Sequence, residues 1–156
     1  MVTLVIDNKT VCVPEGTSIL DAARSVNIDI PTLCYLKDLN EIGACRICMV
    51  EIEGQDTLVA ACDNAVSEGM FIHTNTQKVR MTRRVNLQLL LSQHDVNCVK
   101  CTRSGNCKLQ TLAQEMNILD IPFEQKTAKN KWKASDILLR KDSKCIKCLR
   151  CVSVCD

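Results

Sequence analysis

The chain has 156 residues, of which 12 are cysteine and only four are phenylalanine, tyrosine or tryptophan. With 46% apolar and 24% charged residues it is not a disordered chain, and no apolar run approaches the length of a membrane span. No signal peptide is visible at the start of the sequence, so we expect a cytoplasmic protein with reduced cysteines. So many reduced cysteines require a role other than disulfide bonding.

The charge is unevenly distributed. Residues 1–78 hold five lysine or arginine residues and eleven acidic ones, whereas residues 79–156 hold fifteen and seven. A basic half can indicate nucleic-acid binding, but its only aromatic residues, Phe123 and Trp132, offer few surfaces on which bases could stack. We therefore expect no nucleic-acid partner.

The first 74 residues alternate in the manner of short strands. Residues 3–7 and 10–13 predict a β-hairpin with a turn at Asn8-Lys9, and Thr17 or Ser18 is the predicted N-cap of a helix that begins at Ile19. Further strands are predicted at residues 47–53, 57–61 and 70–73. The pattern is typical of an α+β fold, a small mixed sheet with one helix over it.

A helical period follows from about Asn75, with Val85, Leu89 and Leu90 as its predicted apolar stripe. A second helix is predicted through Leu109, Leu112, Ala113 and Met116. Residues 123–133 are polar and lysine-rich, which is typical of a linker. An acidic ferredoxin is a candidate partner for the lysines between Lys126 and Lys147.

Eleven of the cysteines fall into three groups. The first has the spacing C-x10-C-x2-C-x13-C, with small residues before its C-x2-C pair; it comprises Cys34, Cys45, Cys48 and Cys62. A plant-type [2Fe–2S] site has the same order of cysteines, although its first gap is four residues rather than ten. A four-cysteine zinc site normally has two C-x2-C pairs, so zinc is disfavoured here.

The second group has the spacing H-x3-C-x2-C-x5-C and comprises His94, Cys98, Cys101 and Cys107. A lone histidine at a helix end is more often a cap, but these three cysteines have no fourth cysteine nearby, and a neutral imidazole can replace a thiolate. A [4Fe–4S] cluster and a zinc ion fit this group equally well on local grounds. His73, in a strand far from the cysteine groups, is interpreted as structural.

The third group decides between them. Cys145, Cys148, Cys151 and Cys155 form C-x2-C-x2-C-x3-C, the bacterial ferredoxin run, in which three cysteines bind one [4Fe–4S] cluster and the fourth binds a second. Asp156 stands where a proline usually follows, and the half of such a domain that would complete both clusters is not in the sequence. Cys12 belongs to no group and is predicted to be a small buried residue.

The order of these groups resembles the N-terminal part of the catalytic subunits of iron-only ([FeFe]) hydrogenases, over the whole chain. The resemblance implies a β-grasp, plant-ferredoxin-like [2Fe–2S] domain at residues 1–76 and a helical, histidine-ligated [4Fe–4S] module at residues 77–120. A linker and an incomplete, bacterial ferredoxin-like 2x[4Fe–4S] domain would occupy residues 121–156. It implies as ligands Cys34, Cys45, Cys48 and Cys62 of [2Fe–2S]; His94, Cys98, Cys101 and Cys107 of [4Fe–4S]; Cys145, Cys148 and Cys151 of a further [4Fe–4S]; and Cys155 of its neighbour.

The function implied is the relay of single electrons. The partners would be a flavin- and NAD(P)H-binding subunit, a small [2Fe–2S] subunit and possibly ferredoxin, within a cytoplasmic hydrogenase complex. No catalytic residue is identified in the sequence itself, so the chain is expected to be part of an oxidoreductase catalytic subunit. NAD-dependent formate dehydrogenase α subunits share all three groups and are the alternative; complex I large subunits usually lack a counterpart of Cys155. A zinc-binding nucleic-acid module is the alternative from another class.

Overall fold

The computed structural model describes residues 1–128 and 141–155, and its N-terminal part is built on one mixed sheet. The strands run in the order β2-β1-β5-β3-β4, with β1 and β5 parallel and the other neighbours antiparallel. Their bounds are β1 Val2–Ile6, β2 Lys9–Val13, β3 Met49–Ile52, β4 Val59–Ala60 and β5 Phe71–His73. The predicted mixed sheet is confirmed.

The hairpin turn lies one residue earlier than predicted. Asp7 and Asn8 form it, with φ angles of 45° and 69°, and Lys9 already pairs with Ile6. A two-residue turn with both φ angles positive matches the twist of the strands, and aspartate and asparagine tolerate the left-handed region better than lysine does. The turn residues therefore set the register.

Cys12 is exposed, so the prediction that it lies in the core is wrong. Val11 and Val13 on either side of it are 2% and 7% exposed and face the core. Successive side chains of a strand point to opposite faces, so the residue between two buried valines must point away from the core.

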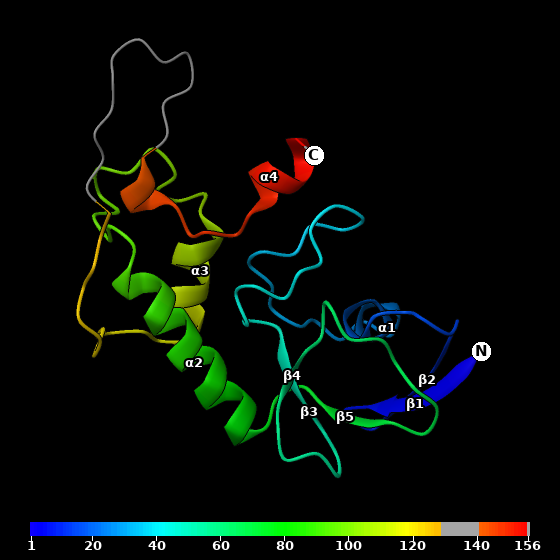
Figure 1. The fold of residues 1–156 in the computed structure, drawn as a ribbon. Coiled ribbons are helices and arrows are strands. Elements are labelled where there is room, and N and C mark those ends of the chain that lie inside the picture. Colours follow the sequence, from blue (N-terminus) through cyan, green and yellow to red (C-terminus); the bar gives the residue numbers. More distant parts are fainter. Residues whose placement is uncertain (129–140, 156) are drawn as a thin grey trace.

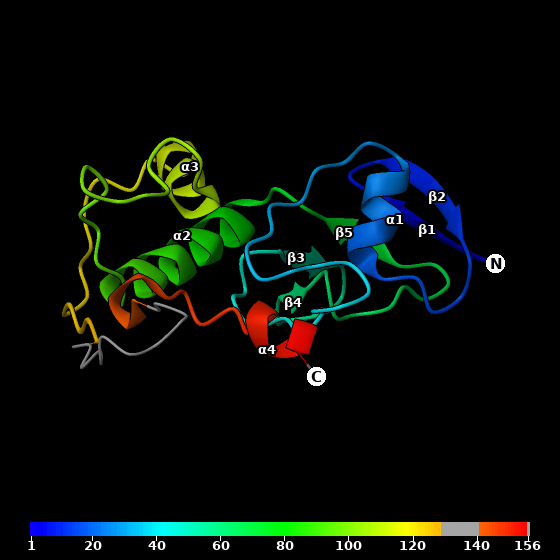
Figure 2. The ribbon, with the colours of Figure 1, turned by 90° about the horizontal axis from the view of Figure 1, so that it is seen from above.

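Helix α1 (Ile19–Ser25) packs on one face of the sheet (Figure 2). Ser18 is its N-cap, and the Ser18 hydroxyl accepts a hydrogen bond from the amide of Asp21 at 3.1 Å. The helix ends where Asn27 adopts a positive φ of 57°. Its buried residues join the main core beneath the sheet: Ile19, Leu20, Ala22 and Ala23.

Helix α2 (Gln77–Ser92) leads away from the sheet (Figure 1) and buries a different face from the one predicted. Val85 and Leu89, assigned to the apolar stripe, are 43% and 41% exposed. The buried face instead contains Val79, Leu87 and Leu91, at four-residue spacing around Arg83. A charged side chain can occupy such a face when its apolar stem is buried and its head is hydrogen-bonded, which hid this face in the hydrophobic pattern.

Arg83 is the link between α2 and the sheet. It is 7% exposed, and its Nε and one Nη donate to the carbonyl of Met49 at the start of β3, at 3.1 and 2.6 Å. Burial lowers the pKa of Arg83 to about 10, which still leaves the guanidinium charged near neutral pH. A single buried guanidinium thus fixes where the helix meets the strand.

We expect Arg83→Met to lower the free energy of unfolding by about 2 kcal/mol, because two charge-assisted hydrogen bonds are lost. The thermal midpoint should fall by about 4–8 °C for a chain of this size. The matched control is Arg80→Met on the same helix, where an exposed guanidinium bonds only to Asn75 at the helix start. Equal midpoints for the two variants would contradict the assigned role of Arg83.

The remaining helices are α3 (Lys108–Glu115), a 3₁₀ turn (Asp142–Lys144) and α4 (Arg150–Cys155). The second predicted helix is confirmed as α3. Part of the predicted linker, residues 129–133, lies outside the described residues. Within the described part of the chain, no helix combines the length and apolar character that crossing a membrane requires.

Candidate metal centres

The four cysteines of the first group lie together in the core, each at most 8% exposed. Cys34 follows α1, Cys45 and Cys48 precede β3, and Cys62 follows β4, so loops from both ends of the sequence pattern converge. The sulfurs of Cys48 and Cys62 lie 3.4 Å apart. The backbone amides of Cys34 and Cys45 each donate to the other residue's sulfur, at 3.4 and 3.5 Å. The group is therefore two pairs, Cys34 with Cys45 and Cys48 with Cys62.

The surroundings of these sulfurs favour negative charge on one member of each pair. Hydrogen bonding with Cys34 lowers the pKa of the Cys45 thiol to about 6, although burial opposes the shift. Hydrogen bonding with Cys62 lowers the pKa of Cys48 in the same way, whereas sharing that bond, together with burial, raises the pKa values of Cys34 and Cys62. Backbone amides also stabilise the Cys45 and Cys48 thiolates. This donor set suits a metal centre that takes thiolates.

A strained turn carries Cys45 and Cys48. Gly43 has a φ of +60° and Arg46 a φ of 53°. A β-carbon at Gly43 would lie 2.2 Å from Oδ2 of Asp63, so this position also lacks room for a side chain. From α2, the amide of Asn86 donates to the carbonyl of Arg46 at 2.7 Å. The turn is thus held by α2 on one side and by the residue after Cys62 on the other.

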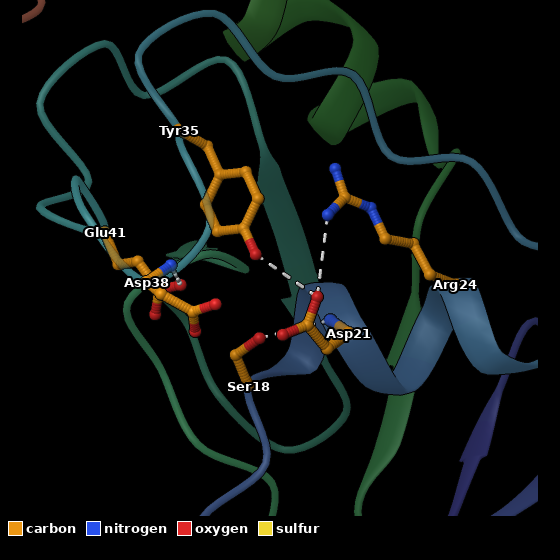
Figure 3. A network of polar contacts seen from close by, with 6 residues as sticks. All are labelled: Ser18, Asp21, Arg24, Tyr35, Asp38 and Glu41. Atoms are coloured by element: carbon orange, nitrogen blue, oxygen red, sulfur yellow. Dashed lines mark hydrogen bonds and ion pairs between the residues drawn. The ribbon is translucent and has the colours of Figure 1, made fainter. Parts of the chain in front are cut away.

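Tyr35 anchors the loop that carries Cys34 (Figure 3). Its hydroxyl donates to Oδ1 of Asp21 at 3.3 Å, and the guanidinium of Arg24 lies 4.8 Å from the centre of its ring and 3.5 Å from the same carboxylate. Burial raises the pKa of Tyr35 to about 12, and the Asp21 charge acts in the same direction, so the phenol remains a donor. The loop before the C-x2-C pair is therefore fastened to α1.

The second group surrounds a cavity. His94, Cys98, Cys101 and Cys107 all line a space of about 670 Å³ between the end of α2 and α3. Nδ1 of His94 is buried and makes no hydrogen bond, the one such side-chain nitrogen or oxygen among the described residues. Buried polar atoms almost always have a partner, so this nitrogen points to a ligand. The structure thus brings together the four residues that the spacing predicted.

Lys144 closes one side of this cavity. Its Nζ donates to the carbonyls of Asp95 and Asn97 at 2.7 and 3.1 Å and pairs with the Asp95 carboxylate at 3.2 Å. Burial, followed by the Lys144 charge, lowers the pKa of His94 and so favours the neutral imidazole, the form that binds metals. The residue just before Cys145 therefore holds the loop between His94 and Cys98.

The third group lies nearer the surface. Cys145 and Cys148 are half-buried, whereas Cys151 and Cys155 on α4 are exposed. The described residues contain no set of three or more His, Cys, Asp or Glu side chains placed to hold a single metal ion. The run does contact the first group, because Arg150 and Asn40 both donate to the carbonyl of Cys34.

Cysteines of all three groups pack in one apolar cluster. Cys34 and Cys45 of the first group are among its buried members, and Cys107 of the second and Cys148 of the third pack against it. Leu87 and Leu91 of α2 and Leu109 and Leu112 of α3 fill the space between them. The three candidate centres are therefore neighbours across a common hydrophobic core.

Two protein families match successive parts of the chain. Residues 1–77 match the 2Fe-2S iron-sulfur cluster binding domain, and residues 83–122 match the NADH-ubiquinone oxidoreductase-G iron-sulfur binding region. The chain carries the iron–sulfur region of the NADH-quinone oxidoreductase G and NAD-reducing hydrogenase subunit family. These matches decide the cofactor class: the region binds [2Fe–2S] and [4Fe–4S] clusters, and the zinc alternative for the second group is dropped.

The iron–sulfur region has hydrogenase subunits among its relatives. It is 43% identical to the NADP-reducing hydrogenase subunit HndD of Solidesulfovibrio fructosivorans, over all of this chain and 28% of that protein. It is 33% identical to the NAD-reducing hydrogenase HoxS subunit gamma of Cupriavidus necator, over 97% of this chain and 64% of that one. A chain of an NAD+-reducing [NiFe]-hydrogenase in the H2-reduced state superposes with a TM-score of 0.87 at 27% identity, covering 97% of this chain and 64% of that chain. The chain thus spans less than two thirds of each of these proteins.

Sequence patterns did not identify the residues that support the three centres. Asn40, Arg83, Lys144 and Arg150 all donate to backbone carbonyls near the cysteines. Such contacts join segments far apart in the sequence, so no local spacing indicates them. Only Arg83 left a signal, its place in the four-residue repeat of buried residues on α2.

Proposed function

We propose that this chain is an electron-relay module, with [2Fe–2S] bound by the first group and [4Fe–4S] by the second. Cys34 and Cys45 would hold one iron of the [2Fe–2S] cluster, and Cys48 and Cys62 the other, as their pairing suggests. His94 would ligate the [4Fe–4S] cluster through Nδ1, beside Cys98, Cys101 and Cys107. When bound, each cluster supplies the capacity to accept and release one electron.

The observation that carries the relay is the shared apolar cluster. It packs cysteines of all three groups against one another and against leucines of α2 and α3. Such a core excludes water from the space between the centres and fixes their separation. The protein's own contribution is therefore positioning, burial and hydrogen bonding to the ligand residues.

The third group extends the proposal. Cys145, Cys148 and Cys151 would belong to a further [4Fe–4S] cluster, with Cys155 reaching a neighbouring one. We propose the domain bounds 1–76, 77–120 and 121–156, with the first unit a β-grasp, plant-ferredoxin-like domain, whose parallel β1–β5 pair and single helix support that assignment.

The context that the relatives support is a cytoplasmic, NAD(P)-linked hydrogenase complex, as their names include NADP-reducing and NAD-reducing hydrogenase subunits. The chain would pass electrons between a flavin- and NAD(P)H-binding subunit, a small [2Fe–2S] subunit or ferredoxin, and a catalytic centre. An iron-only hydrogenase remains our more specific proposal for that centre. Formate dehydrogenase stays an alternative; none of the relatives named above is one.

The test is anaerobic purification with metal and sulfide analysis and electron paramagnetic resonance (EPR). We expect iron with acid-labile sulfide and two separable signals, of which Cys48→Ser removes one and Cys98→Ser the other. Cys12→Ser is the matched control, since that thiol is exposed on β2 and should affect neither signal. Stoichiometric zinc without sulfide would overturn the proposal.

A further inference from the structure

Asn40 joins the first cysteine group to the third. Its side chain is fully buried, and its single Nδ2 donates to the carbonyl of Cys34 at 2.7 Å and to that of Cys148 at 3.0 Å. Its Oδ1 accepts a hydrogen bond from the hydroxyl of Ser153 at 2.8 Å. Both donor hydrogens and the acceptor oxygen of this amide therefore serve the junction between residues more than a hundred positions apart.

Arg150 forms a second contact across the same junction. Its Nε donates to the carbonyl of Cys34 at 3.0 Å, and one Nη donates to the carbonyl of Tyr35 at 2.7 Å. The Cys34 carbonyl thus accepts from both Asn40 and Arg150, which occupies both of its lone pairs. Because Tyr35 is itself fastened to α1, the C-terminal run is tied through this loop to the body of the first domain (Figure 3).

The backbone around Cys148 requires such support. Lys147 and Leu149, on either side of it, have φ angles of 54° and 60°. Left-handed conformations are unfavourable for side chains of this kind and persist where contacts with the surroundings hold them. The Asn40 bond acts on the carbonyl between these two residues, where it restrains both of them.

We infer that Asn40, with Arg150, is a positioning residue that holds the Cys145–Cys155 run against the first cysteine loop and so sets the distance between the two cluster sites. The inference rests on the proposed function for its consequence, since electron exchange between the sites requires clusters in both. Asn40 bonds to the backbone carbonyls of two proposed ligand residues and to neither sulfur, so it acts through them rather than as a ligand.

The alternative is a local role, because Asn40 also closes its own loop through paired backbone bonds with Leu36. A local role predicts changes confined to residues 34–42. A positioning role predicts changes in residues 145–155 as well. The two roles can therefore be separated by a measurement that reports on each segment of the chain.

The measurement is hydrogen–deuterium exchange with mass spectrometry on the cluster-loaded chain. For Asn40→Leu we expect amides of residues 145–155 to exchange roughly tenfold faster, as for the loss of two or three hydrogen bonds, while α2 is unchanged. Asn86→Leu is the matched control: its amide also donates to a carbonyl of the first cysteine group's loops, that of Arg46, but it does not touch the C-terminal run. Exchange confined to residues 34–42 would overturn the inference.

Arg150→Met gives a second route to the same answer and decides the matter if Asn40→Leu does not fold. It should raise exchange in residues 145–155 while the [2Fe–2S] signal is kept; unchanged exchange there would overturn the inference. In the protein with both clusters bound, the magnetic interaction between the first and third sites should also weaken. Normal clusters with unchanged exchange would reject the positioning role alone, whereas a wild-type chain without iron and sulfide would reject the proposed function.

Discussion

Replacing His94 with cysteine will lower the reduction potential of one cluster by about 100 mV or more and leave the other unchanged. The expectation follows from ligand charge: an imidazole is neutral, a thiolate is negative, and exchanging thiolates for histidines raises the potentials of Rieske centres well above those of plant-type ferredoxins. The structure supports ligation because Nδ1 of His94 is buried without a partner in the cavity that the three cysteines line. Redox titration followed by EPR measures the shift.

His73→Cys is the matched control for this experiment. His73 lies on β5, half-buried and apart from the cysteine groups, so the same substitution there should move neither potential. His94→Ala should weaken binding of the same cluster, which would lower its iron content. If none of the His94 variants alters any cluster signal, His94 is a helix-end histidine, bonded through its backbone amide to Leu91 and no more.

Gly43→Val will abolish stable binding of the [2Fe–2S] cluster. The φ of +60° at this position costs a β-branched residue about 1–2 kcal/mol, and the new side chain must also displace the carboxylate of Asp63, the residue after Cys62. The turn that carries Cys45 and Cys48 should shift as a result. We expect the iron and sulfide content to fall to that of the second site, with its EPR signal retained.

Two further variants separate strain from crowding. Gly16→Val imposes similar strain, at a φ of +83°, where no atom lies within 4 Å of the added β-carbon and no cysteine group is near. It should lower the thermal midpoint without loss of the [2Fe–2S] signal. Gly43→Val combined with Asp63→Ala should recover part of the cluster content. Full occupancy in Gly43→Val alone would show that the turn tolerates a side chain.

Local patterns predicted the elements that depend on neighbouring residues. The alternation of the first strands, the Ser18 cap and the helix after Cys107 were all found where the sequence placed them, because turns, caps and periods are set within a few residues. The four residues of the second group also face one cavity, as their spacing indicated.

Features that depend on distant contacts were not predictable in this way. The buried face of α2 was misassigned because Arg83 becomes a buried residue only where Met49 offers its carbonyl. Asn40 gives no sign in its neighbours that its amide will meet Cys148. Cys12 was misplaced for another reason: its chemistry suggested burial, whereas the alternation of its own strand already determined that it faces outward.

Helix α2 has a further consequence for how the chain can vary in length. Arg83 and Asn86 hold the first centre from its middle, and His94 follows its last turn, so the helix acts as a ruler between two centres. One inserted or deleted residue within it would rotate everything beyond by about 100° and move it about 1.5 Å along the axis. His94 would then face away from its cysteines. Changes of length can be absorbed only outside this span, in exposed turns such as the one at Gly54.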